Sequence, residues 1–172
     1  DGSTDESAEV ASVFPGKVLK NGMTKGQSFC RNAGAAVAGG EILAFLDSDC
    51  VASEDWLRSL VPYFQWEKVG AVGGYVDGYY EESALDRYEK VCSSLNMGRH
   101  ILHSAQGPST FYVSTCNLLV RKGLFLENGG IAENLHVGED VDFCWRIRNR
   151  GHALIYVPVG VVLHKHRNGL AR

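Results

Sequence analysis

Blocks of apolar residues recur along this chain between polar stretches, and their lengths and spacings predict strands that alternate with helices. The run Ile42–Leu46 is apolar throughout, as in a strand that is buried on both faces of a sheet. Further extended segments are predicted at 69–76, 111–122 and 153–166, and Pro158 interrupts the last of them. A sheet is therefore expected at the centre of the fold.

Helices are predicted between these strands, because apolar residues recur there at helical spacing. The first helix follows Thr24 and Gln27, whose spacing is that of a capping box. The others are expected at 53–64, 83–99 and 139–149. Strands that alternate with helices indicate one α/β domain over residues 1–172, with a mostly parallel sheet and helices on both of its faces.

The tip of the strand Ile42–Leu46 carries the most informative polar residues, Asp47 and Asp49. If the extended geometry continues, side chains at i and i+2 point to the same side, so the two carboxylates converge. A shared divalent cation would offset their repulsion, and oxygen ligands suit Mg²⁺ or Mn²⁺. The alternative is an ordinary turn, since Asp and Ser are common turn residues.

Composition narrows the class of protein. The net charge is −3 with 22% charged residues, which argues against a basic surface that binds nucleic acid. The apolar runs are far shorter than a membrane span. Five cysteines without a C-x-x-C pair fit reduced thiols in a cytoplasmic protein.

Acidic residues also open the predicted helix at 139–149, where Gly138 precedes Glu139 and Asp140. The positive end of a helix dipole stabilises carboxylates there by about 0.3–1 kcal/mol, which is a sufficient structural explanation. The functional alternative is a general base at the mouth of a site, which takes a proton from an attacking hydroxyl.

Four further residues allow either a structural or a functional interpretation. His164 and His166 lie on one side of an extended segment and are possible metal ligands. Arg31 lies on the first helix and has the guanidinium geometry that suits phosphate. Asp1 begins a segment that is rich in turn-forming residues.

Taken together and in this order, the motifs resemble those of the family 2 inverting glycosyltransferases, which have the nucleotide-sugar-binding GT-A fold. The resemblance runs from the first residue to Arg167. The matching segments are DGSTDES, KGQSFCRNAGAAVAGGEILAFLDSDC, NLLVRKGLFLENGGIAENLHVGEDVDFCWRIRNRG and VVLHKHR.

The resemblance implies a role for each matching residue. Asp140 would be the catalytic base, with Glu139 beside it on the acceptor side. Asp49 and His164 would hold Mn²⁺ or Mg²⁺ at the diphosphate of the sugar donor. The nucleotide-sugar itself would be bound by Asp1 at the nucleobase, Asp47 at the ribose, Arg31 near the nucleotide and Asn117 near the sugar.

The same resemblance implies the partners: a nucleotide-sugar donor, such as a UDP-sugar, and a glycan or lipid-linked acceptor. It leaves open whether the protein associates with the inner face of a membrane and whether it forms a homo-oligomer. Against the family pattern, the strand, helix and strand that precede D-D-G-S are missing, which indicates an N-terminally truncated domain. No Q-x-x-R-W follows the Glu-Asp pair, which favours a non-processive enzyme.

Two other classes of protein remain as alternatives. A nucleotidyltransferase can share the α/β scaffold and a metal-binding pair of acids, and it usually has a glycine-rich loop with a lysine near its start. An inactive module that binds a nucleotide-sugar would also keep the fold. The presence of all four residues in the metal and base positions argues against loss of activity; they are Asp47, Asp49, Asp140 and His164.

Overall fold

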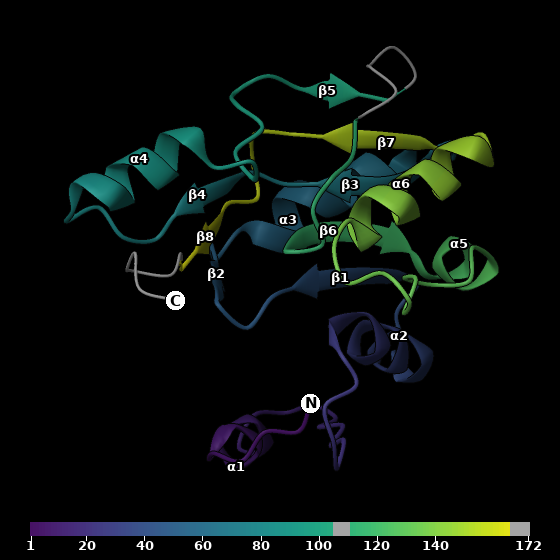
Figure 1. The fold of residues 1–172 in the computed structure, drawn as a ribbon. Coiled ribbons are helices and arrows are strands. Elements are labelled where there is room, and N and C mark those ends of the chain that lie inside the picture. The colour runs from purple at the N-terminus through teal and green to yellow at the C-terminus, as the bar shows by residue number, and fades with distance from the viewer. Residues whose placement is uncertain (105–110, 166–172) are drawn as a thin grey trace.

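The structure, a computed structural model, describes residues 1–104 and 111–165 (Figure 1). Its centre is a five-stranded sheet in the order β1-β6-β3-β7-β5. These strands cover, in that order, Ile42–Leu46, Asn117–Arg121, Val69–Gly73, Ala153–Tyr156 and Leu102–His103. A smaller sheet has the order β2-β8-β4 and is formed by Cys50–Ala52, Val162–His164 and Val76–Gly78.

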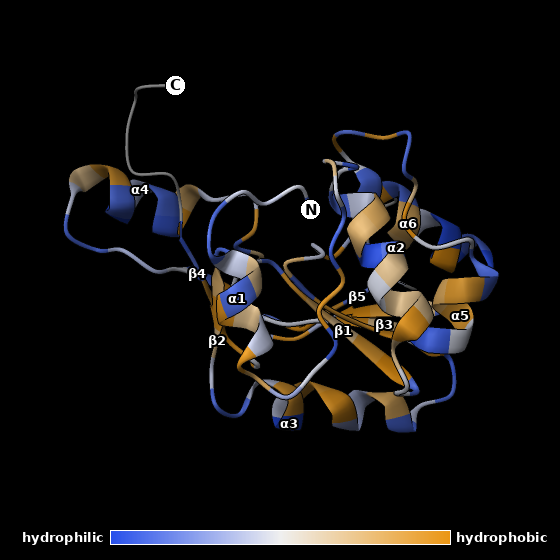
Figure 2. Ribbon diagram, turned by 90° about the horizontal axis from the view of Figure 1, so that it is seen from below, coloured by the Kyte–Doolittle hydropathy of each residue, from blue (hydrophilic) through white to orange (hydrophobic). Residues whose placement is uncertain are grey.

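Helices cover both faces of the large sheet, as the sequence predicts (Figure 2). One face packs against α2 (Gln27–Val37), α5 (Lys122–Glu127) and α6 (Glu139–Asn149), which contribute Ala35, Phe125 and Phe143 among others to the main core. The other face packs against α3 (Trp56–Leu60) and the 3-10 helix Val61–Gln65, through Leu60 and Phe64. The α/β class and the mixed sheet are therefore confirmed.

The expected predominance of parallel strands is wrong for the described residues. In the large sheet only β3 and β7 pair in parallel, whereas β6 is antiparallel to both β1 and β3, and β5 is antiparallel to β7. In the small sheet β8 is parallel to β4 and antiparallel to β2. The reason lies in β6, which enters the sheet beside the end of β1, with Asn117 opposite Leu46, and runs back between its neighbours. Strand periodicity alone carries no information about this insertion.

Burial of β1 also differs from the prediction. Its residues Ala44 and Leu46 are exposed, whereas every residue of β3 is buried. In the described part of the chain, β1 has β6 as its one neighbour and therefore forms an edge of the sheet. An apolar run shows that a strand is buried in some context, but it does not distinguish a central strand from an edge strand.

Several element boundaries move as well. The predicted strand at 69–76 divides into β3 and β4, and the one at 111–122 shortens to β6, after which Lys122 begins α5. The helix predicted at 83–99 ends earlier, as α4 (Ala84–Cys92), and α1 (Ser7–Ser12) was not expected. By contrast, α6 has the predicted bounds.

No helix in the described ranges is both long enough and apolar enough to cross a membrane. The expectation of cytoplasmic localisation goes further than this finding and stays a prediction.

Candidate active site

A turn, and not a continued strand, follows β1. The amide of Cys50 donates a hydrogen bond to the carbonyl of Asp47 at 3.0 Å, which closes the turn and starts β2. Because the extended geometry does not continue past β1, the carboxylates of Asp47 and Asp49 are not brought together by the strand, and each has a different partner. Asp47 pairs with Arg31, while Asp49 pairs with His164.

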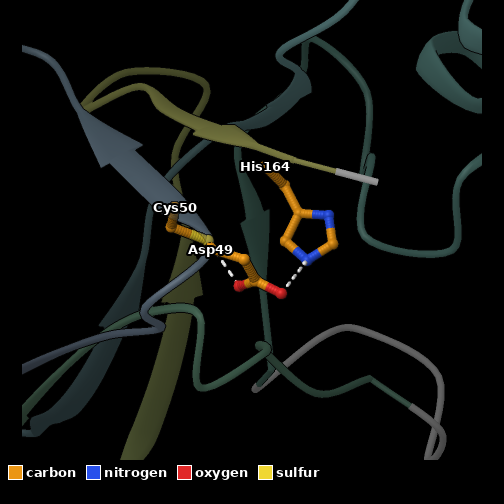
Figure 3. A group of neighbouring side chains, drawn as sticks. All are labelled: Asp49, Cys50 and His164. Carbon is orange, nitrogen blue, oxygen red and sulfur yellow. Dashed lines mark hydrogen bonds and ion pairs between the residues drawn. The ribbon is translucent and has the colours of Figure 1, made fainter. Parts of the chain in front are cut away.

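The first of two polar groups joins Asp49 to His164 (Figure 3). The carboxylate Oδ2 of Asp49 lies 3.6 Å from Nε2 of His164, and the carboxylate is 55% exposed. Pairing of β2 with β8 creates this contact, and the amide of Lys165 donates to the Asp49 carbonyl at 2.8 Å. A carboxylate oxygen and an imidazole nitrogen at this separation are suitable donors for a divalent ion that also binds phosphate oxygens. His166 lies outside the described residues.

Arg31 is the centre of the second polar group. Its guanidinium contacts the Asp47 carboxylate at 2.6 Å and the Glu139 carboxylate at 3.2 Å. The arginine side chain is 11% exposed and that of Glu139 is 8% exposed. Glu139 also accepts a hydrogen bond from the Gln27 side chain at 2.6 Å. One guanidinium thus connects the tip of β1 with the start of α6.

The start of α6 positions Asp140. Gly138 adopts a left-handed conformation with φ +78°, which residues with a Cβ atom rarely adopt. Asp140 then lies in the first turn, where its carboxylate accepts a hydrogen bond from the amide of Val141 at 2.8 Å. Burial raises the pKa of Asp140, and the charge of the neighbouring Glu139 adds to the increase. A raised pKa is the shift that a general base for a hydroxyl needs.

Two neighbouring thiols, those of Cys50 and Cys116, lie near residues of both groups. Cys116 directly precedes β6, and a hydrogen bond between its thiol and that of Cys50 raises the pKa of Cys50, with burial as the second cause. The charges of Asp47 and Asp140 also act on Cys116, so these two carboxylates both lie within electrostatic range of one thiol.

Asp1 has a structural contact that the sequence analysis did not expect. Its carboxylate accepts hydrogen bonds from the amides of Lys25 and Gly26, at 2.9 and 2.8 Å, just before α2. These contacts replace the predicted capping box, because α2 begins at Gln27 and has no side-chain cap. Asp1 therefore fixes the loop that leads into α2, and a contact with a nucleobase stays a prediction.

Asn117 lies in the core, 1% exposed. Its amide group donates to the carbonyls of Tyr75 and Gly160 at 3.0 and 2.9 Å, and its oxygen accepts from the Trp56 indole at 2.8 Å. Both amide hydrogens are thus in use within the protein. This geometry argues against direct contact of the Asn117 side chain with a sugar and favours a role in joining three loops.

The structure brings five of the predicted residues into two connected groups, and it adds Gln27 and Cys50 to them. Arg31, Asp47 and Glu139 form one connected group, and Asp49 and His164 form the other. Gln27 and Cys50 were not among the predicted site residues: the spacing of Gln27 from Thr24 indicated a capping box, and Cys50 was not expected as a neighbour of Asp49. The only signal for Cys50 was its place directly after the D-x-D acids.

A cavity of about 740 Å³ lies elsewhere, at the amino ends of β3 and β7. Its lining includes Lys68, His103, Arg148 and His152, and none of the predicted site residues. We place the candidate site by its chemistry and not by the size of this cavity, because the carboxyl ends of strands are where α/β sheets bind ligands.

Solved structures share this fold. TarS from S. aureus matches with a TM-score of 0.72 and 16% identity, over 95% of this chain and 48% of that one. A mannosyltransferase from Pyrobaculum calidifontis, solved with GDP-Man and Mn²⁺, matches with a TM-score of 0.68 and 18% identity, over 96% of this chain and 46% of that one. At these identities the likeness shows the fold alone, which confirms the expected GT-A architecture.

Sequence relatives point the same way. The pre-mycofactocin glycosyltransferase of Mycobacterium tuberculosis is 35% identical over 155 residues, which are 90% of this chain and 33% of that protein. Glycosyltransferase AglE of Haloferax volcanii is 30% identical over 173 residues, 96% of this chain and 55% of AglE. The chain thus spans between a third and about half the length of these relatives. The profile of the family described as Glycosyl transferase family 2 matches residues 1–128, and the chain belongs to this family.

Proposed function

We propose that this chain transfers a sugar from a nucleoside diphosphate sugar to a hydroxyl acceptor, with the help of a divalent metal and with inversion at the anomeric carbon. The observation that carries the proposal is the position of Asp140, a carboxylate with a raised pKa at the start of α6. It lies next to Glu139, which Arg31 connects to the tip of β1. The membership in family 2 supports the reaction class.

Asp49 and His164 fit the metal. Their donor atoms are 3.6 Å apart, and the exposed Asp49 leaves room for phosphate ligands. Mn²⁺ or Mg²⁺, when bound there, would neutralise the charge that develops on the departing diphosphate. The mannosyltransferase solved with GDP-Man and Mn²⁺ supports this choice of ion.

Arg31 and Asp47 would bind and orient the nucleotide side of the donor. Since the guanidinium already contacts Asp47 and Glu139, its direction is fixed before a donor arrives. Glu139 is buried and holds both Arg31 and Gln27, so we assign it a positioning role. This revises the expectation that Glu139 takes part beside the base.

Asp140 would take the proton of the acceptor hydroxyl as the hydroxyl oxygen attacks the anomeric carbon. The new carbon–oxygen bond forms on one face while the bond to the diphosphate oxygen breaks on the other. The proton ends on the Asp140 carboxylate, and the nucleoside diphosphate leaves with the bonding electron pair. A single displacement of this kind inverts the anomeric configuration.

The variant Asp140→Asn tests this assignment, because the amide keeps the shape of the side chain but accepts no proton. We expect release of nucleoside diphosphate from a panel of nucleotide sugars with Mn²⁺ to slow by about 10²–10⁴-fold. Affinity for UDP with Mn²⁺, measured by calorimetry, should stay near that of the parent chain. Asp142→Asn, in the same first turn, is the matched control.

A small loss of stability with an unchanged rate would show that Asp140 only stabilises the helix terminus. Asp49→Ala tests the metal role separately: we expect the Mn²⁺-dependent part of UDP affinity to disappear.

A further inference from the structure

Cys50 lies where a third metal ligand would be expected. It is the first residue of β2, and the antiparallel register of β2 and β8 places it directly opposite His164. Directly opposite residues in an antiparallel pair point to the same face of the sheet. Its Sγ lies 3.8 Å from Oδ1 of Asp49, and one donor atom from each of these three residues lies within 4.8 Å of the others (Figure 3).

Two of these separations are close to those around a small tetrahedral ion. From usual metal–ligand bond lengths, neighbouring sulfur, nitrogen and oxygen ligands of tetrahedral Zn²⁺ lie about 3.3–3.7 Å apart. Sγ of Cys50 lies 3.8 Å from Oδ1 of Asp49, and Nε2 of His164 lies 3.6 Å from Oδ2 of the same carboxylate. Only small side-chain movements are needed to bring all three donors onto one ion.

We propose that Cys50 is a third ligand at this site and that it enables the site to bind thiophilic divalent ions such as Zn²⁺ and Cd²⁺. The inference rests on the proposed metal role of Asp49 and His164. As the sulfur–metal bond forms, the thiol proton passes to solvent, so that the ligand is a thiolate.

The two kinds of ion would then use the site differently. Mn²⁺ prefers oxygen and nitrogen donors, so it would be held by Asp49 and His164 and keep several positions for diphosphate oxygens. Zn²⁺ would take all three side chains, which leaves one position of a tetrahedral ion. Zn²⁺ bound in this way should therefore compete with Mn²⁺ and reduce metal-dependent donor binding.

The test uses the full chain under reducing conditions with the metals themselves as probes. Titration with Co²⁺ or Cd²⁺ should produce a thiolate-to-metal charge-transfer absorption, which is lost in Cys50→Ser. Zn²⁺ affinity, measured by calorimetry, should fall by at least about 10–100-fold in Cys50→Ser, because loss of a residue that only hydrogen-bonds to a metal ligand already has an effect of this size. Mn²⁺ affinity should change little.

Matched controls separate Cys50 from other thiols. Cys92→Ser removes an exposed thiol of α4 and Cys116→Ser removes the thiol that contacts Cys50; both should keep the absorption. Absence of a thiolate band in the parent chain, or equal Zn²⁺ affinity in the parent chain and Cys50→Ser, would overturn the proposal. The thiolate band is measured on the parent chain alone, so the proposal can be refuted even if a variant folds poorly.

These outcomes also separate this inference from the proposed function. If Cys50 is no ligand but the function is correct, Mn²⁺-dependent UDP affinity survives and still disappears in Asp49→Ala. If the proposed metal site itself is wrong, Asp49→Ala leaves Mn²⁺ affinity unchanged.

Discussion

The central strands and the N-terminal segment of this chain differ sharply in how they are held. In β3 all five residues are buried, and β6 and β7 are buried except for one end residue each. In residues 1–26 no residue is buried, and Val10, Phe14 and Met23 are exposed apolar side chains. The N-terminal segment and α1 lie apart from the body in Figure 1.

The candidate site spans both kinds of region. Asp140 and Glu139 belong to α6, whose Phe143 and Ile147 are fully buried against the sheet. Asp1 depends instead on hydrogen bonds to a loop. The proposed catalytic side of the site is therefore supported by core packing, whereas Asp1, on the proposed nucleotide side, is held by polar contacts.

The largest expected effect contrasts one aromatic residue from each region. Phe143 is 0% exposed and packs on Phe125 with ring centroids 5.2 Å apart, whereas Phe14 is 66% exposed. Phe143→Ala should lower the free energy of unfolding by about 3–5 kcal/mol, because it leaves a cavity in the core. Phe14→Ala should change it by less than about 0.5 kcal/mol. Urea denaturation of both variants is the measurement, and similar losses would remove the contrast.

The second prediction breaks the connection between the two sides. Arg31→Met removes the positive charge beside the buried Glu139 carboxylate and leaves it the hydrogen bond from Gln27. We expect a loss of about 1–3 kcal/mol in the free energy of unfolding. Adding Glu139→Gln should recover part of this loss, and a double-mutant cycle measures the coupling.

Arg58→Met is the control for this cycle, because Arg58 is exposed. A loss as large as that of Arg31→Met, or no recovery in the double variant, would contradict the assigned link.

The third prediction concerns pH and the catalytic side alone. Burial raises the pKa of Asp140 in the folded protein, so the fold keeps that proton to higher pH than the unfolded chain does. The contribution of Asp140 to stability is therefore most favourable below the unfolded pKa and decreases as pH rises to the folded pKa. Asp140→Asn should lack this decrease. Urea denaturation between pH 3 and 7 (about the range around a carboxyl pKa) compares the two proteins, and parallel profiles would refute the effect.

The smallest change in stability is expected at β1. Its outer edge has no neighbouring strand among the described residues, and such edges tend to pair with other chains. We expect the isolated chain to self-associate, and Ala44→Lys, at an exposed position of β1, to reduce this association at nearly unchanged stability. Light scattering over a concentration series is the measurement.

Ala11→Lys introduces the same charge at an exposed position of α1 and should leave the association unchanged. A parent chain that remains monomeric at every concentration would show that the edge is protected.

Local signals in the sequence were sufficient for some elements. The bounds of α6 follow from its apolar spacing and from Gly138 and Gly151, both with positive φ. The short α3 ends at Leu60, and Pro62, two residues later, lies at the start of the 3-10 helix. In each case residues within a few positions determine the geometry, so that spacing is informative.

Long-range contacts explain what the sequence did not reveal. The capping box of Thr24 does not form, because Asp1 supplies the hydrogen-bond acceptor from far along the chain. The insertion of β6 beside β1 makes most strand pairs antiparallel. The contact between Asp49 and His164 was expected only through the family resemblance, since it depends on the pairing of β2 with β8.

That pairing also has a consequence for biosynthesis. β2 lies in the first third of the chain and β8 near the end of the described residues, so a long loop must close before they meet. Contacts between residues far apart in sequence form slowly during folding. In a nascent chain whose β8 has not yet been synthesised, Asp49 is present but His164 is not. If Asp49 and His164 bind the metal as proposed, affinity for it should appear only when folding is nearly complete. Metal uptake would then distinguish finished molecules from partly folded ones.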